Sequence, residues 1–351
     1  MTSTIEHKDA VIEVEEKSSE TRTVVVRMKD PGAYSPRLSC HTRYPLDLIK
    51  AILQVKGPAW LCDEIARDED PEYVQSDLTM SLLSYVGKSD FDGKLIMDFG
   101  CGSGASTVII ARMFPGGRVV GVELDESLLE IARLRTQHYG LRNVDLLHSP
   151  APDQLPKEAS GLDFILLSAV WEHLLPSERP ALLLRMWECL RPEGVLFINQ
   201  TPDARFPLEM HTTLLPLLNY LPDRWVLWCA HKFAKTVPPD ASWEVLLRMG
   251  VRGGTPGEIL KILRKSPSRP LPLHPKADGI KRQSDIYYCS ARKRLSQRYH
   301  GWKRFLILRV VGLAPALGIP IAPYISLAIR RPGEKQVSLT GGRLTHGQET
   351  G

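Results

Sequence analysis

The chain has 351 residues, of which 43% are hydrophobic and 24% charged, and its formal net charge is +5. These values are ordinary for a globular protein with a large core, and they exclude a small scaffold that depends on disulfide bonds. The six cysteines form no C-x-x-C pair, so the sequence contains neither a metal-ligand pattern nor a disulfide framework, and a reducing, cytoplasmic compartment is expected.

Residues 1–35 are rich in Glu, Ser and Thr with little apolar periodicity, which predicts a disordered N-terminal segment. Their polar, acidic start lacks the basic and apolar regions of a secretion signal. Residues 36–90 contain helical stretches at 44–55, 58–65 and 73–86. We expect these helices to form a lead-in or cap before the first strand of the main domain.

Residues 91–293 are predicted to form an α/β domain in which apolar strands alternate with helices. Strands are expected at 94–99, 118–123, 144–148, 162–168 and 195–199, and helices at 104–114, 126–139 and 177–190. Strands separated by helices imply a doubly wound, mostly parallel sheet with helices on both faces. A substrate-side insertion is expected over about 200–240, helices over 241–249 and 255–264, and a weak edge strand over 285–291.

The first of these strands ends in the run Asp98-Phe99-Gly100-Cys101-Gly102-Ser103-Gly104, and the second ends at Glu123. Glycines tolerate positive φ and let a ligand approach the backbone, and the helix that follows offers unpaired N–H groups. Gly100, Gly102 and Ala105 also satisfy a dinucleotide pattern, which alone is a weak signal. Asp98, however, carries a negative charge into the turn, which suits a positively charged ligand better than a pyrophosphate.

The chain resembles the class I S-adenosylmethionine-dependent methyltransferases over roughly residues 90–200. The likeness rests on four motifs in the family's order: the glycine run, Gly121-Val122-Glu123, Leu162–Ser168 with Glu172-His173-Leu174, and Leu190–Phe197. It implies a Rossmann-like fold, S-adenosylmethionine as cofactor, and a cofactor site of Asp98, Gly100, Cys101, Gly102, Gly104, Glu123, Leu124, Ala151 and Ser168. In that site Asp98 would orient the methionine end, and Glu123 would accept hydrogen bonds from both ribose hydroxyls.

The sequence departs from the family after the third strand, where an acidic residue usually lies near the adenine amino group. Here Pro150 occupies that position. We expect the adenine to be held by Ser149, by the backbone of Ala151 or by apolar packing, or else by Asp153 through a shifted loop. Asp125 is expected to cap the next helix and not to bind the ligand.

Methyl transfer is an in-line displacement, so a base is needed only when the acceptor arrives protonated. His173 follows the fourth strand, and Glu209 and His211 follow the fifth. These three are the candidate catalytic residues for an acceptor hydroxyl. For each of them, a structural role in a hydrogen-bonded loop stays open as the alternative.

Residues 294–331 form a basic, apolar extension. Between Lys261 and Arg331 the chain has sixteen Lys or Arg and two acids, and the stretch 310–329 has no charge. Its prolines disfavour one straight membrane-spanning helix. We expect residues 303–331 to form short helical pieces that lie on an anionic membrane surface. The alternative is that this segment is buried within the fold. Residues 332–351 are predicted to be a flexible tail.

The sequence therefore predicts methyl transfer to an oxygen of a small-molecule or lipid-linked acceptor by a cytoplasmic enzyme. Association with a membrane and the oligomeric state stay open. Nucleic acid is not favoured as a partner. Two alternatives stay open: an NAD(P)-dependent oxidoreductase, and a non-catalytic membrane-bound scaffold with a methyltransferase fold. Dinucleotide binding would indicate the first, and liposome binding that survives changes at Asp98 and Glu123 would indicate the second.

Overall fold

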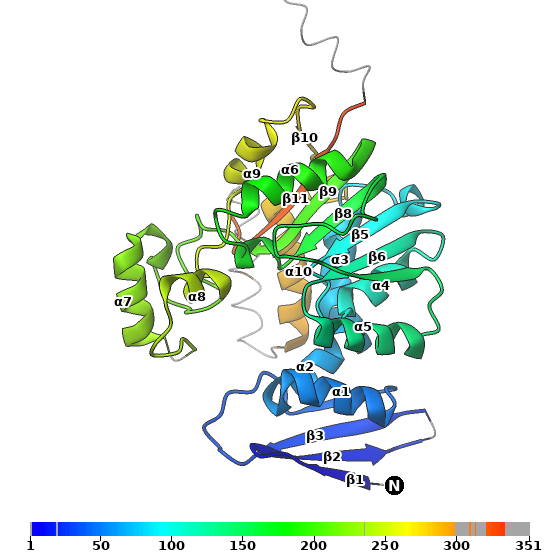
Figure 1. The fold of residues 1–351 in the computed structure, drawn as a ribbon. Coiled ribbons are helices and arrows are strands. Elements are labelled where there is room, and N and C mark those ends of the chain that lie inside the picture. Colours follow the sequence, from blue (N-terminus) through cyan, green and yellow to red (C-terminus); the bar gives the residue numbers. More distant parts are fainter. Residues whose placement is uncertain are drawn as a thin grey trace, which may run out of the picture. The chain divides into compact units, whose positions relative to one another are not determined.

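A computed structural model describes residues 2–18, 20–234, 236–298, 309, 313 and 321–333 (Figure 1). These residues divide into two compact units. Unit 1 is drawn from Met1–Pro156 and Pro275–Pro320, and unit 2 from Lys157–His274 and Ile321–Gly351. Both units combine strands with helices, and the predicted α/β class with mostly parallel strands in the main domain is confirmed.

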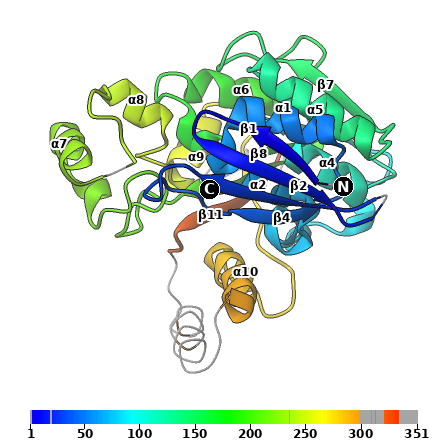
Figure 2. The same cartoon turned by 90° about the horizontal axis from the view of Figure 1, so that it is seen from below.

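Unit 1 begins with an antiparallel sheet in the order β1-β2-β3-β4, which Figure 2 shows from below. Its strands are β1 (Thr2–Glu6), β2 (Ala10–Glu16), β3 (Arg22–Met28) and β4 (Ser39–Thr42). Ala10, Ile12 and Val14 are at most 2% exposed and alternate with the less buried Val11, Glu13 and Glu15, so one face of β2 is buried. The prediction of disorder over 1–35 is wrong, because this two-residue alternation suffices to bury a face despite the many polar residues.

Helices α1 (Leu46–Lys56) and α2 (Pro58–Glu69) pack on one face of this sheet. The π-helical turn η1 (Pro71–Gln75), α3 (Ser76–Leu83) and the 3-10 turn η2 (Lys88–Phe91) follow along the chain. Ile49 of α1 and Leu61 of α2 are fully buried in the same apolar cluster as Ile12 and Val24 of the sheet. The predicted helical lead-in is therefore present, but it is a layer of helices on a sheet.

A β-α-β-α-β segment carries the glycine run. It comprises β5 (Leu95–Phe99), α4 (Ala105–Met113), β6 (Arg118–Glu123), α5 (Glu126–His138) and β7 (Val144–His148), close to the predicted bounds. The three strands are parallel neighbours, with Asp98 opposite Gly121 and Glu123 opposite His148. Asp125 caps α5 as expected, since its Oδ1 accepts the Ser127 N–H at 2.8 Å. The carboxyl ends of β5 and β6 thus lie side by side.

The segment predicted as an edge strand, 285–291, belongs to helix α10 (Gln283–Arg298) of unit 1. Asp285 Oδ2 accepts the backbone N–H groups of Lys281 and Arg282, just before the helix. Ile286 and Ser290 lie four residues apart and are both buried, which is helical spacing. The strand prediction is wrong because the weak alternation on which it rested does not coincide with burial.

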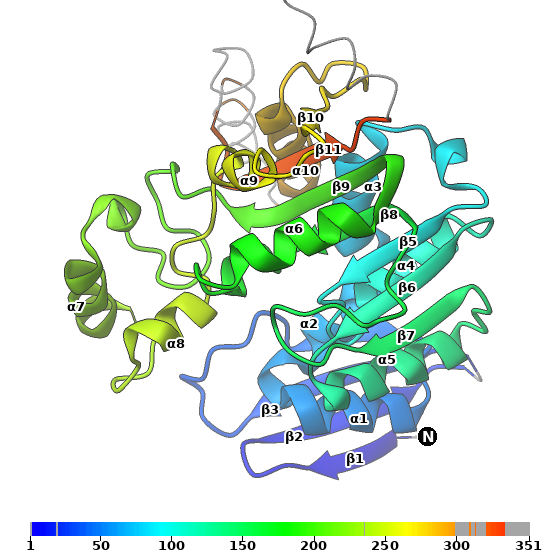
Figure 3. The same cartoon turned by 45° about the horizontal axis from the view of Figure 1, so that its top comes forward.

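Unit 2 contains two parallel strands, β8 (Leu162–Ser168) and β9 (Leu190–Pro202). Strand β11 (Tyr324–Arg330) pairs antiparallel with β9, and the short β10 (Leu271–Pro272) pairs antiparallel with β11. Helix α6 (Arg179–Cys189) connects β8 to β9 and packs against β9 (Figure 3). The two strands predicted for this region are confirmed, although β9 extends further at both ends.

Strand β11 comes from the apolar stretch that predicted a membrane-surface anchor. Leu327, Ala328 and Ile329 are at most 1% exposed. For 324–330 the anchor prediction is wrong, and residues 324–329 lack charge because both faces of the strand are covered. Most of the remaining extension, and the tail beyond Gly333, lies outside the described residues. Among the residues that the structure describes, no helix has the length and apolarity needed to cross a membrane.

The rest of unit 2 consists of short helices: η3 (Trp171–His173), η4 (Leu218–Tyr220), α7 (Asp223–Phe233), α8 (Trp243–Arg248) and α9 (Pro256–Leu263). The expected insertion after β9 contains η4 and α7. Val226 and Ala230 of α7 pack with Leu246 of α8 in one apolar cluster. Helix α9 starts at the expected cap, where Thr255 Oγ1 accepts the Glu258 N–H at 3.1 Å.

Candidate functional site

The glycine loop joins β5 to α4. Gly100, Gly102 and Gly104 all have positive φ, at 71°, 56° and 84°. A Cβ atom on Gly104 would lie 2.6 Å from the Ala132 Cβ of α5, so only glycine lets the loop approach that helix. A Cβ on Gly102 would meet no atom within 4 Å. The loop therefore presents bare backbone at Gly102, where a ligand can lie close.

Asp98 lies at the end of β5 and is 1% exposed. Its Oδ2 accepts hydrogen bonds from Ser106 Oγ and Thr107 Oγ1, both at 2.7 Å, at the start of α4. Burial raises the pKa of Asp98, and the two hydroxyl groups oppose that rise. The carboxylate thus fixes the strand-to-helix turn. Its predicted contact with the methionine end of a cofactor stays a prediction.

Glu123 ends β6 and lies against the glycine loop. Its Oε2 accepts the Gly102 N–H at 2.8 Å, and its Oε1 accepts the N–H groups of Leu124 (2.8 Å) and Asp125 (3.0 Å). The residue is only partly buried. Unlike Asp98, it therefore holds a carboxylate with accessible surface beside the bare backbone of Gly102.

The other predicted cofactor residues lie in different surroundings. Cys101 is buried and Leu124 is 42% exposed. Ala151 belongs to a compact turn, in which its carbonyl oxygen accepts the Ser149 hydroxyl at 3.0 Å and the Gln154 N–H at 3.1 Å. Ser168 ends β8 in unit 2. The structure thus brings Asp98, Glu123 and the glycines together within unit 1, while Ser168 belongs to the other unit.

A buried network behind the loop has no counterpart in the sequence predictions. Arg135 of α5 is 0% exposed, and its Nη1 donates to the Ser103 carbonyl oxygen at 2.9 Å and to Glu64 Oε1 at 3.1 Å. Its Nε donates to the Tyr44 hydroxyl at 3.0 Å and lies 3.5 Å from Asp68 Oδ1. These residues span ninety-one positions of the chain, so no local pattern connects them.

A second cluster, entirely within unit 2, gathers Glu172, His173 and His211. Glu172 is 1% exposed, its Oε2 accepts the Thr201 hydroxyl at 3.0 Å, and burial raises its pKa to about 7. The imidazole rings of His173 and His211 have centroids 5.1 Å apart. Burial lowers the pKa of His173. The pKa of His211 is lowered to about 4, mainly by burial and to a smaller extent by the neighbouring His173. Both rings are therefore neutral near pH 7.

Glu209 organises the loop that carries His211. It is 1% exposed, and its two carboxylate oxygens accept backbone N–H groups from His211, Thr212 and Thr213 as well as the Thr213 hydroxyl. A carboxylate with so many donors has little capacity left to take a proton from a substrate. Of the three predicted catalytic residues, the geometry thus favours a positioning role for Glu209 and groups the two histidines with Glu172.

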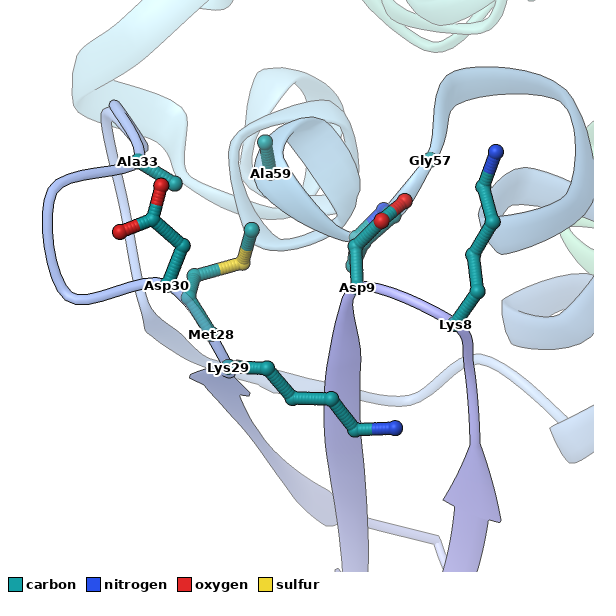
Figure 4. A pocket seen from close by; sticks show the side chains of 9 residues that line it. Lys8, Asp9, Met28, Lys29, Asp30, Ala33, Gly57 and Ala59 are labelled. Carbon is teal, nitrogen blue, oxygen red and sulfur yellow. The ribbon is translucent and has the colours of Figure 1, made fainter.

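A separate hollow of about 340 Å³ lies in unit 1, beside the N-terminal sheet (Figure 4). Lys8, Asp9, Lys29 and Asp30 line it together with the start of α2. None of its lining residues is one of the predicted site residues. Its lining has mixed charge, with two lysines and two aspartates.

Comparison with known proteins identifies the segment that carries the loop. Residues 96–194 match a family model described as a methyltransferase domain. Trans-aconitate 2-methyltransferase from Acidovorax sp. is 33% identical over 108 residues, which cover 31% of this chain and 38% of that protein. Ubiquinone biosynthesis O-methyltransferase from Ruegeria pomeroyi is 26% identical over 164 residues, which cover 46% of this chain and 61% of that protein. The chain thus matches 38% of the length of the first relative and 61% of the length of the second, less than two thirds of either.

Solved structures with detectable likeness include two methyltransferases. A SAM-dependent methyltransferase from Aquifex aeolicus is 20% identical, with a TM-score of 0.32 over 43% of this chain and 80% of that one. A putative sarcosine dimethylglycine methyltransferase from Galdieria sulphuraria is 12% identical, with a TM-score of 0.42 over 82% of this chain and 98% of that one. The family match is the stronger finding: residues 96–194, which carry the glycine loop and the strands around it, are similar to a methyltransferase domain.

The residues of unit 1 fit S-adenosylmethionine as the cofactor. A ribose diol can donate hydrogen bonds to a carboxylate, and Glu123 is partly exposed at the loop. Its oxygens already accept three backbone N–H groups, so a ribose hydroxyl would share them with the loop. The open backbone at Gly102 leaves room for a nucleoside against the loop. After β7, Ser149 is buried and its hydroxyl donates to the carbonyl oxygens of Ala151 and Gln154 within its own turn. How the adenine is held therefore stays a prediction.

Proposed function

We propose that this protein transfers a methyl group from S-adenosylmethionine to a hydroxyl oxygen of a small-molecule or lipid-linked acceptor. The observation that carries this proposal is the Glu123 carboxylate held beside the bare backbone of Gly102. When bound, the cofactor supplies a methyl carbon activated by the adjoining sulfonium. The chain's own residues then have to bind the nucleoside, orient the acceptor oxygen and let its proton leave.

For the acceptor we propose the cluster of unit 2. The rings of His173 and His211 have centroids 5.1 Å apart and lie with the buried carboxyl group of Glu172, so the cluster gathers polar atoms for a hydroxyl group, directly or through a bound cation. Oxygen as the target agrees with the name of one relative, an O-methyltransferase. The small size of the acceptor agrees with the small molecules in the names of both relatives.

An exposed aromatic face on α7 supports a lipid-linked acceptor. Trp225, Trp228 and Phe233 are 50–57% exposed, and their rings contact one another edge to face. The opposite face of α7 buries Val226 and Ala230 in unit 2, so the outer aromatic face is free for another surface. Tryptophan favours the boundary between lipid headgroups and acyl chains. We propose that this face contacts a bilayer that holds the acceptor.

Two binding measurements and one mass measurement test the function. We expect calorimetry to show binding of S-adenosylhomocysteine and no binding of NADPH, and the reverse result would favour the oxidoreductase. Lipid and saccharide extracts from cells lacking the protein should contain a compound one methylene lighter than in wild-type cells. Complementation with a Glu123→Gln variant should not restore the heavier compound. The control variant Glu126→Gln removes an exposed carboxylate of α5 and should restore it.

The aromatic face is tested separately by co-sedimentation with liposomes. Replacing Trp225 and Trp228 with serine should reduce binding to vesicles and leave the affinity for S-adenosylhomocysteine unchanged. The matched control is Tyr34→Ser, a large exposed aromatic side chain of unit 1. Equal vesicle binding by all three proteins would refute the lipid-surface part of the proposal and leave methyl transfer untouched.

A further inference from the structure

We propose that Glu172, His173 and His211 form a binding site for a divalent transition-metal cation of the Zn²⁺ class. One ligand atom from each residue, a carboxylate oxygen and two imidazole nitrogens, lies within 4.8 Å of the other two. All three residues belong to unit 2. The site's use in holding an acceptor oxygen rests on the proposed function, whereas the metal site itself does not.

The buried carboxylate of Glu172 is the observation that points to a ligand. Its Oε2 accepts the Thr201 hydroxyl at 3.0 Å, but its Oε1 is buried and has no hydrogen-bond partner among the described residues. A buried carboxylate oxygen without a partner is costly, and such groups are normally paired or coordinate a metal. A cation between Glu172 and the two imidazoles would supply the missing partner.

His173 is oriented as a metal ligand. Its Nδ1 donates to the carbonyl oxygen of Arg248 at 2.6 Å, which places the ring proton on Nδ1 and leaves the Nε2 lone pair free. Metal-binding histidines characteristically donate their second ring nitrogen to a carbonyl or carboxylate in this way. Arg248 is itself held by Glu178, with 2.7 Å between Nη1 and Oε2. The ring of His173 is therefore fixed before any ion binds.

His211 and Glu172 are brought together around Gly250. A Cβ atom on Gly250 would lie 2.6 Å from His211 Cδ2, 3.1 Å from His211 Nε2 and 3.1 Å from Glu172 Cγ. Gly250 also has φ of 90°, which other residues rarely adopt. The backbone of His211 is held by Glu209, whose Oε1 accepts its N–H at 2.7 Å. The fold thus leaves room for the two side chains only because position 250 has none.

The ligand set selects the kind of cation. Two imidazole nitrogens with one carboxylate suit Zn²⁺ and neighbouring transition metals, whereas Mg²⁺ and Ca²⁺ prefer oxygen ligands alone. Bond lengths of about 2.0–2.2 Å would draw the three ligand atoms closer together on binding. Three protein ligands leave a coordination position open. An acceptor hydroxyl in that position would have its pKa lowered, which favours loss of its proton.

The test uses the chelator-treated full chain in two titrations. Calorimetry monitors the titration with Zn²⁺ alone, and visible absorption monitors the titration with Co²⁺. We expect one equivalent per chain. Loss of a residue that only hydrogen-bonds a metal ligand typically weakens metal binding by roughly 10–100-fold. Glu172→Gln and His211→Asn remove a ligand itself, so each should weaken Zn²⁺ binding by more than that. Thr201→Val removes only the outer hydrogen bond to Glu172 and should fall within that range. His274→Ala, an exposed histidine of the same unit, should bind as the wild type does.

Several results would overturn the site. Binding of less than one equivalent by the wild type would do so, as would unchanged affinity in both ligand variants. If those variants do not fold, X-ray absorption of the Zn²⁺-loaded wild type decides, because a first shell without two imidazoles contradicts the assignment. Titration of the same samples with S-adenosylhomocysteine separates the two proposals. Zn²⁺ binding without nucleoside binding would leave the metal site standing and remove the methyltransferase function.

Discussion

Arg135 Nη1 donates to the backbone carbonyl oxygen of Ser103 at 2.9 Å, and so ties helix α5 to the glycine loop. The same nitrogen donates to the Ser103 hydroxyl at 2.6 Å and to Glu64 Oε1 at 3.1 Å. Arg135 is fully buried, and Glu64 is 7% exposed. The conformation of the candidate cofactor loop therefore depends on a buried ion pair as well as on its glycines.

Replacing Arg135 with methionine should strongly destabilise unit 1. The change leaves the buried carboxylates of Glu64 and Asp68 without their cation, and loss of one partner of a buried pair costs about 3–5 kcal/mol. Urea denaturation would measure the free energy of unfolding. Arg133→Met is the matched control on the same helix, because its ion pairs are exposed and should be worth under about 1 kcal/mol. Equal losses in both variants would contradict the role given to Arg135.

Stability should fall in acid through Glu64. Burial alone would raise the pKa of Glu64. This effect is outweighed by the positive charges of Arg135, Arg67 and Lys56 and by the hydrogen bond from the Ser103 hydroxyl. The resulting pKa of Glu64 is about 2, compared with an ordinary value of 4.5. A folded-state pKa below the unfolded one gives stability that is present above pH 4.5 and lost as the pH falls towards 2. Thermal unfolding across this window should therefore show a falling midpoint. Glu64→Gln should make the midpoint lower at pH 7 and less dependent on pH.

Gly104→Ala should destabilise the protein more than Gly140→Ala. Both glycines have positive φ, 84° and 61°, so each substitution incurs the backbone cost of about 1–2 kcal/mol. At Gly104 the new methyl group would also lie 2.6 Å from Ala132 Cβ, whereas at Gly140 nothing lies within 4 Å. Adding Ala132→Gly should recover part of the difference. Chemical denaturation of the wild type and the three variants checks this, and equal losses at both glycines would rule out the close approach.

Glu123→Gln should weaken binding of S-adenosylhomocysteine. The amide keeps one acceptor oxygen but loses the charge, and a hydrogen bond to a charged group contributes about 1.5–3 kcal/mol, so we expect at least a tenfold loss. Calorimetry measures this, with Asp125→Asn as the neighbouring control, since Asp125 bonds Ser127 of its own helix. Because Glu123 also accepts the Gly102 N–H, a melting curve should accompany each titration. An unchanged affinity would exclude Glu123 from the nucleoside site.

The sequence predicted the β-α-β-α-β segment well because its signals are local. Apolar runs of five to seven residues, breaks at Gly100 and Gly140 and the cap at Asp125 are all read from neighbouring positions. The same approach failed for 1–35 and 285–291, where local composition or weak alternation did not reflect which side chains other elements cover. The uncharged residues 324–329 were likewise predicted to bind a membrane surface, although they belong to a strand that pairs with β9.

The sequence by itself determined the chemistry at the ends of β5 and β6, because an acid next to three glycines and a second acid one strand later lie within twenty-six residues. Tertiary structure decided which of these acids is accessible: it buries Asp98 against two hydroxyls and leaves Glu123 partly exposed. It also joined Arg135 to Ser103, and Glu172 to His211 around Gly250. Burial and long-range pairing are properties of the packed chain, so no spacing along the sequence contains them.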